Sequence, residues 1–316
     1  MVDSFQGISL GFFGTPKFSL GFLKKLHENN FKIEYVVTQP PKPSGRGKKT
    51  NFSPVHEWSK KNNFNIFFPK DVNDKTFIKS IEKIKVDFFV VVAYGQKISK
   101  ELLMIPKQMC LNVHTSLLPK WRGASPIQSS IKNGDRETGV SIIKMTENLD
   151  AGPIIKKKKI SISMNDTAAS IESKMSLYGH ETLNQSIKDI FFEKFNLTPQ
   201  NEDLATYARK ISKKDAKINW KNSAISINRF IRAYNPFPGA WSNILTKNYR
   251  IKIFETEIFE NQKIFKSLKV GECTPCLSVK CNDKFLKIKK LQPEGKKIMT
   301  SEEFLNGYET NNLLLG

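Results

Sequence analysis

Phe88-Phe-Val-Val-Val-Ala93 is an unbroken apolar run that lacks the alternation of a half-buried strand. Such a run is typical of a strand covered on both faces, as in a parallel sheet. A strand is also indicated from Ile8 to Phe13; helical spacing follows from Phe18 to Asn29, and a further strand signal from Glu34 to Thr38. This alternation predicts a doubly wound α/β fold with a mostly parallel sheet.

The alternation continues toward the middle of the chain. Ser53-Pro54 predicts a helix start, with Ser as the N-cap and Pro at the first helical position. We expect further strands at Cys110 to His114 and Val140 to Met145, and helices around Pro126 to Asn133 and from Thr167 to about Phe192.

The pattern changes after residue 192. The stretch Glu193 to Asp203 contains Thr198-Pro199 and several polar residues, as a linker does. From Tyr249 onward short alternating segments are punctuated by Gly and Pro, which predicts a small β-barrel. We therefore expect a catalytic domain over residues 1–192, a linker over 193–208 and a second domain over 209–316.

The charge is strongly positive. Among 316 residues, 51 Lys plus Arg stand against 30 Asp plus Glu, a formal net charge of +21. Residues 1–200 carry 30 basic and 18 acidic residues and residues 201–300 carry 21 and 9, so an equal excess falls in half the length in the second segment. This distribution indicates a partner with many phosphates. The alternative is a proteome that simply favours Lys.

Composition also excludes several classes of protein. With 26% charged and 11% aromatic residues, the chain is globular, not disordered. The run from Ile8 is too short to span a membrane, and Asp3 stands where a secretory signal would carry a basic residue, so we expect a cytoplasmic protein without a membrane partner. We also expect a monomer. Cys273, Cys276 and Cys281 lack a nearby fourth ligand, so we expect no metal.

Three polar side chains are the strongest candidates for chemistry. Asn112 and His114 are two positions apart, which on a strand places them on one face. Asp150 follows a second expected strand in a loop that can return it to the same sheet edge, where open α/β sheets bind ligands. Each residue alone has a plain structural explanation, but together they predict a site.

The segments around these residues are Asn112-Val-His-Thr-Ser-Leu-Leu-Pro119, Trp121-Arg-Gly-Ala-Ser-Pro126 and Leu149-Asp-Ala-Gly152. They resemble the signature of formyltransferases that use 10-formyltetrahydrofolate as formyl donor. Further segments are similar to the methionyl-tRNA formyltransferase family in particular, so that the resemblance covers nearly the whole chain: Phe12 to Pro16, Thr38 to Lys49, Ser53-Pro-Val55, Val91 to Gly95, Tyr207 to Lys210, Arg232 to Pro238 and Leu291 to Lys297.

The resemblance implies a Rossmann-like formyltransferase domain followed by an OB-like tRNA-binding domain. It implies formyl transfer from 10-formyltetrahydrofolate to methionyl initiator tRNA, for translation initiation, with Asn112, His114 and Asp150 as catalytic residues. Asn112 and His114 would donate to the developing oxyanion, and Asp150 would orient His114 and take part in proton transfer. Thr115 and Ser125 depart from the family pattern, which has Gly and Ala there, and neither change removes a catalytic group.

The resemblance also suggests binding residues. The turn Ser116, Leu117, Leu118 and Pro119 would contact the formylfolate, with Tyr94 nearby. The loop Pro40 to Thr50 has no apolar face and must be exposed, and the family inserts it into the tRNA acceptor arm. Its candidate contacts are Lys42, Arg46, Lys48 and Lys49, and those of the second domain begin with Lys210 and Lys213.

Two other functions fit parts of the sequence. A formyltransferase acting on a small amine would share the three catalytic residues but leaves the basic loop and the basic second domain unexplained. A non-catalytic RNA-binding protein would explain the charge, but it predicts a damaged site, whereas Asn112, His114 and Asp150 are all present.

Overall fold

The chain forms two compact units in a computed structural model that describes residues 7–44, 49–247, 249–259, 267–308 and 312–316. Unit 1 comprises Met1–Gly123, Thr138–Ile160 and Glu172–Tyr207, and unit 2 comprises Ala124–Glu137, Ser161–Ile171 and Ala208–Gly316. Two segments that precede residue 172 therefore belong with the C-terminal unit, which the sequence did not indicate.

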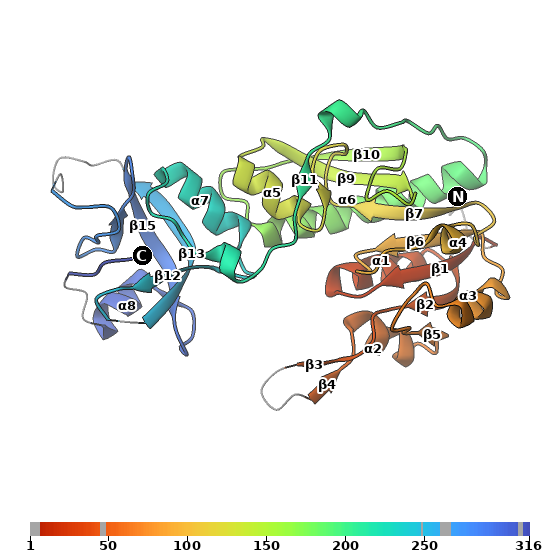
Figure 1. Cartoon of the computed structure of the whole chain (residues 1–316), viewed down its shortest axis with the longest axis horizontal. Coiled ribbons are helices and arrows are strands. Elements are labelled where there is room, and N and C mark those ends of the chain that lie inside the picture. Colours follow the sequence, from red (N-terminus) through yellow and green to blue (C-terminus); the bar gives the residue numbers. More distant parts are fainter. Residues whose placement is uncertain (1–6, 45–48, 248, 260–266, 309–311) are drawn as a thin grey trace. The chain divides into compact units, whose positions relative to one another are not determined.

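Unit 1 is built on a seven-stranded sheet with the order β10-β9-β7-β6-β1-β2-β5 (Figure 1). Four neighbouring pairs are parallel, namely β1 with β2, β1 with β6, β6 with β7 and β2 with β5, which confirms the mostly parallel sheet. β9 is antiparallel to β7, with Ser141 opposite His114. The strands are β1 Ser9–Gly14, β2 Lys32–Val37, β5 Ile66–Phe67, β6 Phe88–Val92, β7 Met109–His114, β9 Glu137–Lys144 and β10 Ile154–Ser161.

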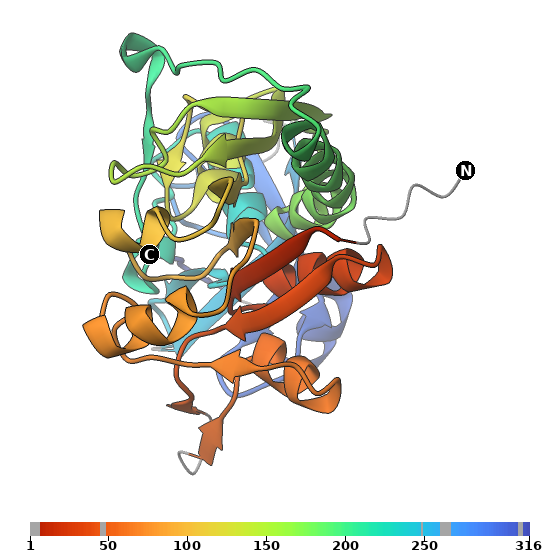
Figure 2. The ribbon, with the colours of Figure 1, turned by 90° about the vertical axis from the view of Figure 1, so that its right-hand side faces the viewer.

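Helices cover both faces of this sheet. Figure 2 shows α1 (Lys17–Glu28) and α6 (Ala168–Phe191) on one side and α3 (Lys75–Glu82) and α4 (Lys100–Leu103) on the other. Phe13 of β1 packs in one buried cluster with Phe77 and Ile81 of α3. On the opposite face α6 passes so close to α1 that a side chain at Gly179 would strike the ring of Phe22. The sheet is therefore doubly wound, as predicted.

A short hairpin lies between β2 and helix α2 (Pro54–Lys61). Its strands are β3 (Lys42–Ser44) and β4 (Lys49–Asn51), paired antiparallel. Ser53 caps α2, as the sequence predicts, because its Oγ accepts a hydrogen bond from the backbone N–H of His56 at 3.0 Å. The basic loop expected from Pro40 to Thr50 thus contains a hairpin, and its tip lies outside the described residues.

Unit 2 is rich in antiparallel strands around a buried apolar core. Its sheet has the order β12-β13-β15-β14, with β16 added to β15. Isolated bridges join Ile244 to Leu315, Glu272 to Leu314 and Cys273 to Val279, so that the C-terminal residues link the two edge strands. This closure supports a small barrel, and the OB-like assignment stays a prediction. The elements are α5 Pro126–Asn133, α7 Ala224–Ala233, β12 Ala240–Ile244, β13 Tyr249–Phe259, β14 Ser278–Lys280, β15 Phe285–Pro293, β16 Met299–Thr300 and α8 Ser301–Gly307.

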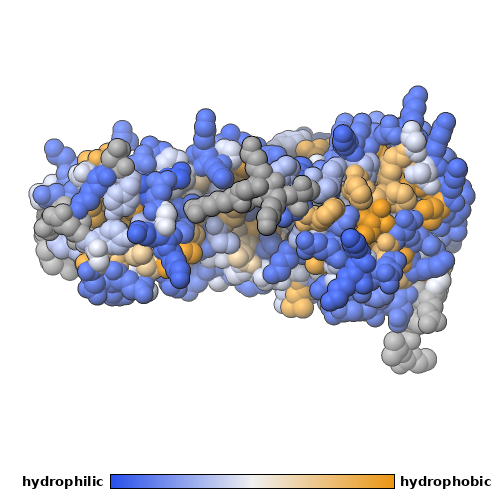
Figure 3. All heavy atoms as spheres, turned by 90° about the horizontal axis from the view of Figure 1, so that it is seen from below, coloured by the Kyte–Doolittle hydropathy of each residue, from blue (hydrophilic) through white to orange (hydrophobic). Residues whose placement is uncertain are grey.

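On the face drawn in Figure 3, charged and polar residues predominate, and apolar residues gather over part of unit 1. Among the described residues, none of the helices is both long enough and apolar enough to cross a bilayer.

Candidate active site

Strand β7 carries the first two candidate residues. Asn112 and His114 lie on the same face of β7 as Cys110, which packs in a buried cluster with Leu102 of α4. Burial raises the pKa of the Cys110 thiol far above its ordinary value, so this side chain stays protonated. The two polar side chains therefore extend from an apolar base on the α4 side of the sheet.

Asp150 reaches these residues through a tight loop after β9. The loop returns to the sheet at once, because the N–H of Lys144 donates to the carbonyl of Pro153 at 3.0 Å. A side chain at Gly152 would collide with the carbonyl oxygen of Lys144, so glycine is required there. Asp150 itself has φ +50°, in the left-handed region. The loop thus turns the Asp150 carboxylate toward β7.

The Asp150 carboxylate lies at the centre of the site. Its Oδ1 accepts from Asn112 Nδ2 at 3.3 Å, and its Oδ2 accepts from the backbone N–H of Gly123 at 2.8 Å. Oδ2 also lies 3.5 Å from Nδ1 of His114. The structure therefore brings together all three residues that the sequence singled out.

His114 is nearly buried, with a side chain that is 6% exposed. Its Nε2 lies 2.9 Å from the carbonyl oxygen of Trp121, so both ring nitrogens face acceptors. Only a doubly protonated ring can donate to both, and a neutral ring donates to one of them. The imidazole is thus held in place by contacts at both ring nitrogens.

This arrangement can stabilise negative charge and move protons. An amide nitrogen carries two N–H groups, so Asn112 can donate to Asp150 and to a reacting oxygen at the same time. Asp150 and His114 supply a carboxylate and an imidazole within 3.5 Å of each other, a combination that commonly transfers protons. Among the described residues, no group of three or more His, Cys, Asp and Glu side chains is placed to hold a metal ion.

The turn from Ser116 to Pro119 is held from the neighbouring strand. The hydroxyl of Ser141 on β9 accepts from the N–H of Leu118 at 3.1 Å and donates to the carbonyl of Ser116 at 2.7 Å. Lys157 on β10 donates to the carbonyl of Leu118 at 3.2 Å. Leu118 is buried against Ile143 and Ile154. The conformation of the turn is therefore set by β9 and β10, which the sequence did not indicate.

Tyr94 packs inside unit 1. The side chain is 2% exposed, and its ring meets that of Phe13 edge-on at 5.6 Å. Burial raises the pKa of its hydroxyl, which has no hydrogen-bond partner among the described residues. Its backbone carbonyl accepts from Thr15 Oγ1 at 3.0 Å. The structure therefore gives Tyr94 a place in the core, and its predicted contact with folate stays a prediction.

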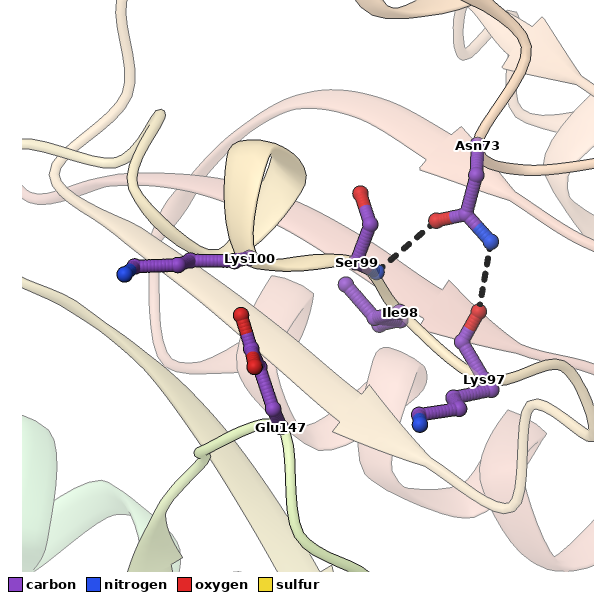
Figure 4. Close-up of a pocket in the computed structure, with 6 residues that line it drawn as sticks. All are labelled: Asn73, Lys97, Ile98, Ser99, Lys100 and Glu147. Carbon is purple, nitrogen blue, oxygen red and sulfur yellow. Dashed lines mark hydrogen bonds between the residues drawn. The ribbon is translucent and has the colours of Figure 1, made fainter.

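A cavity of about 260 Å³ opens beside the loop that carries Asp150. Figure 4 shows Glu147 of this loop facing the segment that precedes α4. The Asn73 amide holds this segment, donating to the carbonyl of Lys97 at 2.9 Å and accepting from the N–H of Ser99 at 2.8 Å. Sequence reasoning missed the lining residues, which are Asn73, Lys97, Ile98, Ser99, Lys100 and Glu147.

The basic candidates are only partly described. Lys42 is exposed on β3, Arg46 and Lys48 lie outside the described residues, and of Lys49 the structure describes only the backbone on β4. In unit 2, Lys210 and Lys213 are exposed.

Two other lysines, both on β15, are paired. Lys289 lies 3.6 Å from Glu257 and Lys290 lies 2.8 Å from Glu255. Part of the positive charge on this strand is therefore balanced within unit 2.

Comparisons with known proteins cover nearly the whole chain. A family model described as formyl transferase matches residues 9–187, and one described as formyl transferase, C-terminal domain, matches residues 210–309. A methionyl-tRNA formyltransferase of Thermodesulfovibrio yellowstonii is 39% identical over 308 residues, which is 95% of this chain and 96% of that protein. A methionyl-tRNA formyltransferase of Buchnera aphidicola is 39% identical over 307 residues, 95% of each chain.

Solved structures agree in fold. The sugar 3N-formyl transferase WlaRD, determined in the presence of dTDP and 5-N-formyl-THF, has a TM-score of 0.64 at 21% identity, covering 92% of this chain and 99% of that one. HypX of Aquifex aeolicus in complex with tetrahydrofolic acid has a TM-score of 0.65 at 18% identity; 97% of this chain matches half of that protein.

Proposed function

Because the chain belongs to the methionyl-tRNA formyltransferase family, we propose that Asn112, His114 and Asp150 are its catalytic residues. The chain transfers the formyl group of 10-formyltetrahydrofolate to the amino group of methionine esterified to initiator tRNA, the modification used in translation initiation. The observation that carries the site assignment is the convergence of an amide, an imidazole and a carboxylate around Asp150.

The reaction sets two requirements for the protein. The methionyl nitrogen forms a bond to the formyl carbon, the bond from that carbon to the folate nitrogen breaks, and one proton passes from the amine to the folate nitrogen. Negative charge develops on the formyl oxygen meanwhile, and the Asn112 amide donates to it with the N–H that Asp150 does not accept. Asp150 and His114 take up the proton from the amine and return it to the leaving nitrogen.

The formyl donor binds beside these residues. The turn from Ser116 to Pro119 follows His114 directly, and its conformation is fixed by Ser141, so it offers a rigid edge to the folate. The cavity next to Glu147 has about 260 Å³, below the range of about 300 to 1,000 Å³ that is usual for whole ligands. Its size suits one ring system of the folate, with the remainder of the molecule outside.

The acceptor tRNA is held by its backbone phosphates. The net charge of +21 and the exposed Lys42, Lys210 and Lys213 provide the attraction. Arg46, Lys48 and Lys49 belong to the same proposal through the sequence of the hairpin. We place the protein in the cytoplasm, where initiator tRNA is charged, and expect it to act as a monomer, which light scattering at assay concentration would test.

The proposed function is tested by competition between acceptors. Purified protein is mixed with 10-formyltetrahydrofolate and either methionyl initiator tRNA, free methionine or an amino-sugar nucleotide, and formylated product is quantified after ester hydrolysis. We expect product from the charged tRNA alone. Formylation of the amino-sugar nucleotide at a comparable kcat/KM would instead assign the chain to small-amine substrates.

A further inference from the structure

The carbonyl groups around Asp150 are held from outside its own loop. Asp150 has φ +50°, a conformation that is uncommon for residues other than glycine, although Asp adopts it more readily than most. The carboxylate is bound by Asn112 and Gly123, but these bonds hold only the side chain. Within the loop the N–H of Ala151 reaches the carbonyl of Asn148 only at 3.4 Å, and this contact leaves the carbonyls of Asp150 and Gly152 to other donors.

Gln200 supplies these contacts from a distant segment. Its Nε2 donates to the carbonyl oxygen of Asp150 at 2.8 Å and to that of Gly152, also at 2.8 Å. The two N–H groups of one amide therefore hold the two peptide carbonyls that flank Ala151. Gln200 lies in the stretch that sequence analysis predicted to be a linker.

The guanidinium of Arg122 fixes the orientation of this amide. Arg122 Nε and Nη2 donate to Oε1 of Gln200 at 3.1 Å and 2.9 Å. Because a guanidinium has only donors, the amide oxygen must face Arg122 and the amide nitrogen must face the loop. The Arg122 side chain is 2% exposed and is also bound by both oxygens of Glu202, at 2.7 Å and 2.8 Å. A hydrogen bond from Arg122 lowers the pKa of the Glu202 carboxyl, so this partner stays ionised.

These contacts close a ring around Asp150. Arg122 reaches the Asp150 carbonyl through Gln200, and the next residue, Gly123, donates its N–H to the Asp150 carboxylate. Main chain and side chain of Asp150 are thus held by two consecutive residues of the Trp121-Arg122-Gly123 segment. Without Gln200, the carbonyls of Asp150 and Gly152 lose these hydrogen bonds, while the Asp150 carboxylate keeps its bond to Gly123.

We propose that Gln200 is a positioning residue for catalysis: its amide nitrogen, oriented by Arg122, holds the Asp150–Gly152 peptide units so that the Asp150 carboxylate faces Asn112 and His114. This inference rests on the proposed function of the site. It assigns to the supposed linker a part in the reaction without contact with either substrate.

The substitution Gln200→Glu tests the proposal because it replaces the donor with an oxygen that repels the two carbonyls. The carboxylate has the size of the amide and keeps its contact with Arg122, but it cannot donate to the two carbonyls. We expect kcat to fall about 10- to 100-fold, as small displacements of catalytic groups do, with KM for methionyl-tRNA within about 2-fold of wild type. Gln185→Glu is the matched control for an added charge, since Gln185 is exposed on α6 and its amide donates to Asp189 of the same helix.

Gln200→Ala separates positioning from packing. If the donor matters, both variants lose kcat, and Gln200→Glu, in which a carboxylate oxygen faces two carbonyl oxygens, loses at least as much as Gln200→Ala. If Gln200→Ala is impaired but Gln200→Glu has the kcat of wild type, Gln200 serves only as a hydrogen-bond acceptor for Arg122, and the proposal is wrong.

A measurement without turnover distinguishes this inference from the proposed function. The Gly123 amide proton donates to the Asp150 carboxylate, so its NMR chemical shift reports the position of that carboxylate. We expect this resonance to move in Gln200→Glu and not in Gln185→Glu; an unchanged Gly123 shift would overturn the inference even in an active enzyme. Wild-type protein that formylates no methionyl-tRNA would overturn the proposed function, while the Gly123 resonance would still decide the role of Gln200.

Discussion

Nδ1 of His114 lies 3.5 Å from Oδ2 of Asp150, although one residue ends a strand and the other belongs to a loop after the next strand of the sheet. The same oxygen accepts the N–H of Gly123 at 2.8 Å. The distance between imidazole and carboxylate therefore depends on how tightly the loop returns to the sheet. Several consequences of this arrangement can be measured.

Gly152→Ala should impair both stability and activity. A methyl group there would collide with the carbonyl of Lys144, so the loop must shift and carry Asp150 with it. We expect the free energy of unfolding to fall by about 1 to 3 kcal/mol, measured by urea denaturation, and kcat to fall with it. Gly307→Ala is the control because a methyl group there meets no atom within 4 Å. Equal effects of the two substitutions would contradict the role of Gly152.

Ser141→Ala should weaken binding of the formyl donor. The buried hydroxyl satisfies the N–H of Leu118 and the carbonyl of Ser116, and its loss frees the turn that we propose to contact the folate. Unsatisfied buried groups cost about 1 to 3 kcal/mol, so we expect KM for formyltetrahydrofolate to rise about 10-fold with KM for tRNA unchanged. Ser130→Ala, which removes a buried hydroxyl in α5, should leave both KM values in place. If KM for the donor is unchanged in Ser141→Ala, the turn does not contribute to folate binding.

The pH dependence of stability should contain a contribution from His180. Burial, and then the nearby charge of Lys25, lower the pKa of His180 from 6.5 to about 4. Between these values the unfolded chain binds a proton that the folded chain does not, so stability falls as pH falls from about 6.5 toward 4. The slope from one such group is at most about 1.4 kcal/mol per pH unit. Below about pH 4 both states are protonated and this contribution no longer changes.

Melting temperatures measured from pH 7 to pH 4.5 would reveal this contribution. His180→Gln should flatten the fall at acid pH, whatever its effect at pH 7, while His27→Gln on the exposed side of α1 should not. Parallel curves for wild type and His180→Gln would mean that folding does not lower the pKa of His180.

Replacing Lys210 and Lys213 with Ala should weaken tRNA binding in a salt-dependent way. Each lysine that neutralises a phosphate adds about 1 to the slope of log affinity against log salt, so the double variant should lose about 2. Binding can be followed by fluorescence anisotropy between about 50 and 200 mM salt, where the affinity of such contacts changes strongly. Lys290→Ala should change the slope little because Lys290 pairs with Glu255 at 2.8 Å.

Local patterns in the sequence predict the parts of the site that lie on one element. The spacing of Asn112 and His114 on an expected strand correctly placed both on one face, and Ser53-Pro54 correctly marked the start of α2. Contacts between distant segments leave no such pattern. Gln200 lies in a polar stretch that reads as a linker, and only the fold brings its amide to the Asp150 loop. The apolar residues of β9 predict a strand, but they do not tell whether it runs parallel or antiparallel to β7, and the structure shows it to be antiparallel.

Tyr94 illustrates the opposite limit. The resemblance to the formyltransferase family made it a candidate for contact with folate. In the structure its ring is buried against Phe13. Position along a strand is readable from sequence, whereas the direction of a single side chain in the following turn is not.

The most direct test of the catalytic assignment is single-turnover formyl transfer by wild type, His114→Ala and Asn112→Asp, with formyltetrahydrofolate and methionyl-tRNA both saturating. The arrangement around Asp150 predicts that each variant binds both substrates with Kd values within about 3-fold of wild type. The rate of transfer should fall about 100- to 1,000-fold, because a donor to the developing charge or a proton carrier is lost. Transfer at the wild-type rate in either variant would contradict the assignment of that residue to the reaction.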